Sequence, residues 1–99
     1  MTETYNGWAN RETWALMLHI NNDEALQSGA LDAIRATGDS AESDRLLREY
    51  AEMLFTRTGW DAACGGQWPD GLADASTDIG SLWRVDWREC VQALVEDVA

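Results

Sequence analysis

The sequence contains no lysine, and its 99 residues include only one proline, one histidine, one phenylalanine and two cysteines. All seven basic residues are arginines, and with eighteen acidic residues the formal net charge is 7 − 18 = −11. Direct nucleic-acid binding and docking on an anionic membrane both need clustered basic side chains, so we expect neither. An acidic protein instead attracts basic surfaces, including the nucleic-acid grooves of other proteins. A GC-rich genome or adaptation to salt would also explain the missing lysine.

The scarcity of cysteine and histidine argues against metal and covalent chemistry. Cys64 and Cys90 have no CxxC spacing and follow no apolar leader, so we expect two reduced thiols in a cytoplasmic protein. His19 lies inside an apolar run, and nothing in the sequence brings it to either cysteine as a catalytic pair. Structural zinc sites show paired ligands at short spacing, which these three residues lack. We therefore predict no catalytic residue, no metal, no cofactor and no enzyme activity.

Hydrophobic periodicity predicts an all-α fold for residues 1–99, a compact single domain of four to five helices. The expected helices cover residues 10–21, 23–36, 40–57, 71–82 and 86–98. Residues 60–70, "WDAACGGQWPD", contain two adjacent glycines and the single proline, which indicates one loop rich in glycine and tryptophan. A small strand pair beside this loop is also compatible with the sequence. The longest apolar run, residues 14–20, is too short to span a membrane.

Helix boundaries follow from short polar residues and glycines. Asn10 and Asn22 are predicted to cap the first two helices, and Gly59 to end the third. Gly29 allows a close helix crossing or weakens the second helix. Two tetrapeptides, residues 39–42 and 86–89, have the spacing of a capping box.

The stretch "YNGWANRETWALMLHINND", residues 5–23, resembles the opening signature of a family of small, acidic, uncharacterised proteins from phages, plasmids and halophilic archaea. The family pattern is close to NGW-x-N-x-ETW followed by an apolar run and ND. The closing segment "VDWRECVQALVED" is similar to the family's tail. The signature residues are Trp8, Asn10, Glu12, Trp14, Asn22 and Trp87. The family has no established catalytic activity, and the resemblance implies a setting on a mobile genetic element, often a phage. Together with the acidic charge and the lack of a catalytic constellation, this setting favours an anti-defence or anti-CRISPR role in the cytoplasm of a host cell.

The signature residues have structural and functional interpretations. Glu12 is either a general acid or base beside tryptophans, or a first-turn carboxylate that suits the helix dipole; the second is favoured. Trp8, Trp14 and Trp87 could form a ligand cage, but large aromatic anchors joining the two chain ends explain them better.

Acidic residues gather in the second and third expected helices. The candidate partner-binding residues are Asp32, Asp39, Glu42, Asp44, Glu49 and Glu52. In the preferred hypothesis, they bind a basic nucleic-acid-binding surface of a host defence complex, by occlusion or by nucleic-acid mimicry. The expected partner is a protein, and the chain is a monomer or a homodimer. In the alternative, the chain is an interaction module whose acidity serves solubility or salt adaptation, with apolar contacts at Trp60 and Trp68.

Overall fold

The computed structural model describes residues 5–38 and 40–98, and over these residues it confirms the all-α class. The elements are α1 (Arg11–Asn21), α2 (Glu24–Ile34), α3 (Ala41–Phe55), α4 (Arg57–Ala63), α5 (Asp70–Ile79), the 3₁₀ turn η1 (Leu82–Arg84) and α6 (Trp87–Val98). Within the described ranges the only β pairing is a single bridge between Tyr5 and Trp8. Six helices replace the four to five that the sequence predicts.

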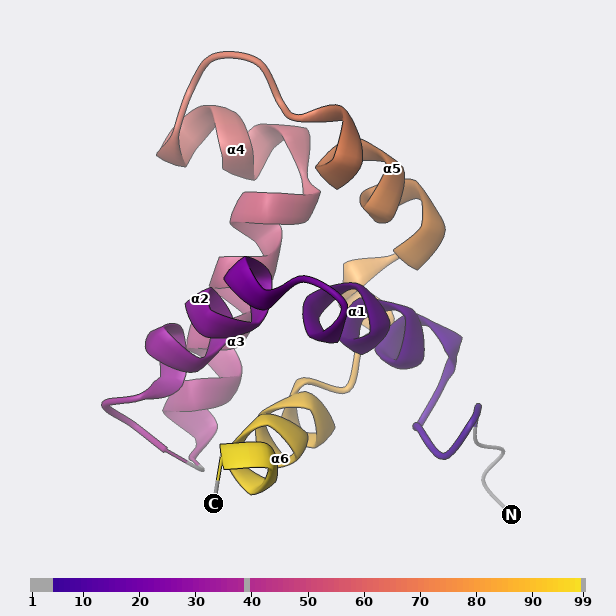
Figure 1. Ribbon diagram of the computed structural model, residues 1–99, viewed down its shortest axis with the longest axis vertical. Coiled ribbons are helices and arrows are strands. Elements are labelled where there is room, and N and C mark those ends of the chain that lie inside the picture. Colours follow the sequence, from indigo (N-terminus) through magenta and orange to yellow (C-terminus); the bar gives the residue numbers. More distant parts are fainter. Residues whose placement is uncertain (1–4, 39, 99) are drawn as a thin grey trace.

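Helix α3 is the longest element and the centre of the packing. It contacts α2, α4, α5 and α6, while α1 lies across the bundle and contacts α2, α5, α6 and η1 (Figure 1). Side chains from these helices meet in a core whose most buried members include Leu16, Ile20, Leu47, Phe55 and Leu94. Burial of such large apolar side chains supplies the main force that holds the helices together.

The cap predicted for the first helix is correct, and the cap predicted for the second is wrong. Asn10 Oδ1 accepts the backbone N–H of Thr13 at 2.9 Å, as an N-cap does. Asn22 instead ends α1, and Asp23 caps α2 by accepting the N–H of Ala25 at 2.9 Å. An ionised carboxylate at this position also interacts favourably with the helix dipole, which explains why the aspartate is used.

The third helix begins one residue later than its predicted capping box. Ser40 is the N-cap, and its hydroxyl accepts the N–H of Ser43. Asp39, the predicted cap, lies outside the described residues. Glu42 pairs with Arg45 one turn later. The cap that the structure describes is therefore Ser40, one residue after the predicted position.

The predicted glycine- and tryptophan-rich loop begins too early, because residues 57–63 form α4. Gly59 lies inside this helix and does not end α3. A Cβ atom at Gly59 would lie 2.1 Å from the carbonyl oxygen of Glu52, so only glycine lets α4 pack this closely on the end of α3. Thr56 makes the turn between them, with its hydroxyl accepting the Gly59 N–H at 2.9 Å.

The predicted close crossing at Gly29 is present. A Cβ atom there would lie 2.3 Å from the hydroxyl oxygen of Tyr50 on α3. That hydroxyl donates a hydrogen bond of 2.9 Å to the carbonyl of Leu26 on α2. Burial, and then the nearby charges of Asp23 and Asp32, raise the pKa of Tyr50, so the phenol stays a donor at neutral pH.

Candidate functional site

The first part of the signature is a tight turn that presents Trp8. Tyr5 and Trp8 exchange two backbone hydrogen bonds of 2.7 and 2.8 Å. Asn6 (φ 50°) and Gly7 (φ 88°) occupy the two central positions, as a type I′ turn requires. The ring of Tyr5 lies 5.0 Å from that of Trp14. This turn is not among the elements predicted from the sequence, although the Asn-Gly dipeptide at residues 6–7 is a strong signal for a type I′ turn.

The second part of the signature ties α1 to the start of α6. The buried hydroxyl of Thr13 donates to Asn10 Oδ1 at 2.7 Å and accepts the backbone N–H of Asp86 at 2.9 Å. The Asn10 amide nitrogen donates to the carbonyl of Arg84 at 2.7 Å. These bonds join residues more than seventy positions apart, so the first and last parts of the signature form one structural unit.

The capping box of α6 is half correct. Asp86 accepts the N–H of Glu89 at 3.1 Å, as predicted. Glu89 does not return the bond to Asp86; its Oε1 accepts the backbone N–H of Ala9 at 2.8 Å. The carboxylate therefore joins the Trp8 turn to α6.

Glu12 and His19 both contact charged partners from the second half of the chain. Glu12, with a side chain 20% exposed, pairs with Arg84 at 3.4 Å. His19 Nε2 lies 2.9 Å from Asp78 on α5, and Arg11 pairs with the same carboxylate at 3.2 Å. The hydrogen bond from His19, and then the charges of His19 and Arg11, lower the pKa of Asp78.

The tryptophans divide into five that pack and one that does not. Trp8, Trp14 and Trp87 are half-buried against the core, as expected for anchors between the chain ends. Trp60 and Trp68 are the apolar contacts of the alternative hypothesis. Both are half-buried, and Trp68 Nε1 donates to the carbonyl of Leu54 at 2.8 Å.

Trp83 is the exposed tryptophan, with 82% of its surface accessible. It lies on η1, beside a groove of about 340 Å³ lined by Arg48, Glu52, Leu82, Trp83 and Trp87. The guanidinium of Arg84 lies 5.7 Å from the centre of its ring. No pattern in the sequence predicts this exposure, because it depends on how a three-residue turn lies between α5 and α6.

The predicted acidic partner-binding residues lie on α2 and α3, and each described member has an arginine partner. The pairs are Asp32–Arg35 (2.9 Å), Glu42–Arg45, Glu49–Arg45 (2.6 Å), Glu52–Arg48 (3.5 Å) and Asp44–Arg88 (2.5 Å). Asp44 differs from the others in that its arginine partner comes from α6 and not from a neighbouring turn of the same helix. The acidic charge of this face is therefore partly compensated, and Asp39 lies outside the described residues.

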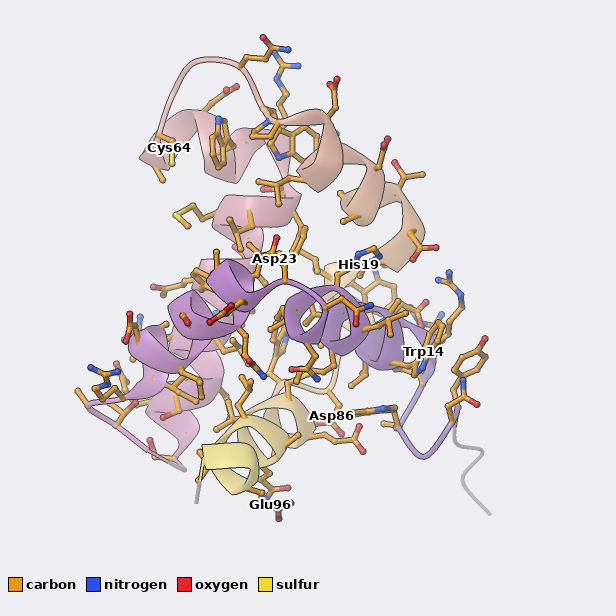
Figure 2. The ribbon with its side chains drawn as sticks, in the orientation of Figure 1. Trp14, His19, Asp23, Cys64, Asp86 and Glu96 are labelled. Carbon is orange, nitrogen blue, oxygen red and sulfur yellow. The ribbon has the colours of Figure 1, made fainter. Side chains whose placement is uncertain are left out.

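The two thiols lie in different environments. Cys90 is buried on α6, and burial raises the pKa of its thiol, so it stays protonated at neutral pH. Cys64 is exposed at the end of α4, well separated from His19 (Figure 2). Residues 5–38 and 40–98 contain no group of three histidine, cysteine, aspartate or glutamate side chains placed to hold a metal ion. Every helix in these ranges is too short or too polar to cross a bilayer.

Comparison with known proteins gives a family but no function. No curated protein and no solved structure matches the chain. One family model matches residues 1–99, and its description is a family of unknown function, DUF7249. This match agrees with the expectation of an uncharacterised family. The chain therefore belongs to this family of unknown function, DUF7249.

Proposed function

We propose that the protein acts by binding another protein, with Trp83 as the main anchor. The observation that carries this proposal is the 82% exposure of Trp83 at the edge of a groove. Tryptophan is among the residue types most enriched in the side chains that dominate binding energy, and this one leaves a large apolar surface in water. The neighbouring Leu82 and Trp87 extend the apolar contact.

The charge of the chain supports a basic partner. The face around the groove includes Glu52 and continues along α3 to Glu49 and Glu42, where arginines on the same helix pair with the carboxylates. Exposed ion pairs of this kind exchange partners at little cost, since each contributes about 0–1 kcal/mol. They would form a polar rim around the apolar anchor, while the net charge of −11 speeds encounter with a basic surface.

The specific role that we propose is inhibition of a host defence complex. The resemblance to phage and plasmid proteins supplies the setting, and the nucleic-acid groove of a defence enzyme supplies a basic surface. Because the carboxylates of α3 already have arginine partners, we favour occlusion anchored by Trp83 over mimicry of nucleic acid by α3 alone.

The experiment is an inhibition assay with purified defence nucleases and the matched variants Trp83→Ala and Glu49→Gln. Loss of a central anchor costs about 2 kcal/mol or more, so Trp83→Ala should weaken inhibition by about 30-fold or more. Glu49→Gln changes a rim ion pair and should weaken it by less than about fivefold. Full inhibition by Trp83→Ala would reject the anchor.

A second function remains supported by the same exposed tryptophan. In it, the chain is an interaction module of a phage or plasmid, and its acidity serves only solubility or salt adaptation. Salt dependence separates the two, because electrostatic attraction to a basic surface weakens steeply as ionic strength rises, whereas a purely apolar contact does not. Binding that is unchanged between low and high salt would favour this second function.

A further inference from the structure

A second groove lies between the Trp8 turn and α6. It has a volume of about 230 Å³ and is lined by Gly7, Trp8, Glu89, Gln92, Ala93 and Glu96. The turn closes one side, and α6 supplies the other, with residues 89, 92 and 96 following one face of the helix. The groove is smaller than the 300–1,000 Å³ or so of pockets that hold drug-sized ligands, so a single side chain is the better fit.

The walls of this groove are held in place by hydrogen bonds. Two backbone bonds close the turn from Tyr5 to Trp8, and Glu89 Oε1 accepts the N–H of Ala9. The indole of Trp8 also packs against the core. Trp8 and the Glu89 carboxylate are therefore positioned before any ligand arrives, which lowers the entropic cost of binding.

The charge of this groove, unlike that of α3, is uncompensated. Each of the seven arginines pairs with a carboxylate elsewhere, including Arg88, which points from α6 towards Asp44 of α3. Neither Glu89 nor Glu96 has an arginine or histidine partner among the described residues, and no basic residue lines the groove. Glu96 lies on the outer face of α6, away from the bundle (Figure 2).

An apolar notch adjoins the groove, because Trp8 also lines a smaller hollow of about 120 Å³ with Trp14, Met17, Leu18 and Asn21. Leu18 is one of the few large apolar side chains in the described residues that are exposed, at 38%. The surface around Trp8 thus offers two carboxylates and a place for an aliphatic side chain.

We propose that this groove binds an arginine side chain of a protein partner, with an aliphatic neighbour of that arginine in the notch. A guanidinium can stack on the indole of Trp8 while its N–H groups donate to Glu89 and Glu96, and its weak hydration makes it a better occupant than an ammonium. The inference deepens the proposed function by naming the chemistry of the partner, but it does not depend on Trp83.

The test is an NMR titration of the ¹⁵N-labelled protein with a capped Leu-Arg-Leu peptide. We expect chemical-shift changes at the Trp8 indole N–H, at Gly7 and at Ala93. Glu96→Gln should weaken binding about three- to tenfold, the usual effect of removing one charge-assisted contact at a partly exposed site. Asp74→Asn removes the same charge from an exposed position on α5 and should leave the affinity unchanged. A citrulline peptide, with the same shape but no charge, should not bind.

Three outcomes would overturn the proposal. Equal weakening by Glu96→Gln and Asp74→Asn would mean diffuse attraction to an acidic protein, not a site. Shift changes centred on Trp83 would place the peptide in the other groove. Concentration-dependent shifts at Trp8 without peptide would make a second copy of the chain the occupant. If the peptide does not bind at Trp8, the proposal for Trp83 is unaffected. If Trp83→Ala still inhibits fully, the titration at Trp8 is unaffected, so the two proposals can fail separately.

Discussion

Thr13 provides the sharpest test of how the signature works, because one hydroxyl joins α1, its cap and the start of α6. The side chain is fully buried, donates to Asn10 Oδ1 at 2.7 Å and accepts the N–H of Asp86 at 2.9 Å. Thr13→Val keeps the shape and removes both bonds. The cap itself survives, since Asn10 still accepts the backbone N–H of Thr13.

The expected loss of stability follows from the hydrogen-bond partners of Thr13 that the valine leaves unsatisfied. A lost hydrogen bond costs about 1 kcal/mol, and a donor left without a partner costs about 1–3 kcal/mol, so Thr13→Val should lower the free energy of unfolding by about 2–3 kcal/mol. For a domain of this size, that lowers Tm by about 8–20 °C. Thr13→Ser retains the hydroxyl, loses one methyl group and should cost only about 1 kcal/mol.

Urea denaturation and thermal melts followed by circular dichroism measure both variants. The m-value should not change, because the folded and unfolded states expose the same surface. If Thr13→Val is as stable as Thr13→Ser, the hydroxyl does not join the chain ends, and the account of the signature is refuted.

Three further predictions concern glycine packing, the thiols and pH. Gly59→Ala should lower the free energy of unfolding by about 2–3 kcal/mol, because the new Cβ would lie 2.1 Å from a backbone oxygen. The control Gly71→Ala places its Cβ with no atom within 4 Å and should raise the free energy of unfolding by about 0.5–1 kcal/mol. Equal effects of the two variants in urea melts would contradict the packing of α4 on α3. A thiol reagent at mildly alkaline pH should label Cys64 in the folded protein, and Cys90 only after denaturant is added; fast labelling of both in the folded state would show that Cys90 is not buried. Hydrogen bonding to His19 lowers the pKa of Asp78 below its ordinary 3.8, so the ionised carboxylate stabilises the fold above that pH. Asp78→Asn should therefore lower Tm near neutral pH, and the difference in Tm from the wild type should vanish as pH falls to about 2. A difference in Tm that persists in acid would reject the pairing.

The fold could be predicted where local chemistry decides it. Asn10 and Asp86 are short polar residues before periodic apolar runs, and both cap their helices as predicted. Gly59 was misassigned because a glycine after a helix looks like a stop, whereas here it permits close contact with Glu52, which only the tertiary arrangement reveals. The choice of Asp23 over Asn22 shows that neighbouring capping residues are hard to separate by sequence.

The candidate site was less predictable, because it depends on which side chains meet across helices. Asp44 is one of the predicted partner-binding residues, but its partner Arg88 comes from α6, so its charge is compensated. The exposure of Trp83 follows from the position of η1, and the meeting of Trp8 with Glu89 follows from contact between the two ends of the chain. No pattern within one segment carries this information.

The most direct test of the central claim is capture of binding partners from host lysate by immobilised wild-type protein and by Trp83→Ala, each at low and high salt. We predict that the wild type retains a basic protein at low salt and less of it at high salt, and that Trp83→Ala loses it under both conditions. Glu49→Gln should behave as the wild type. Retention of the same partner by Trp83→Ala with undiminished yield would contradict the claim that this exposed tryptophan is the binding anchor.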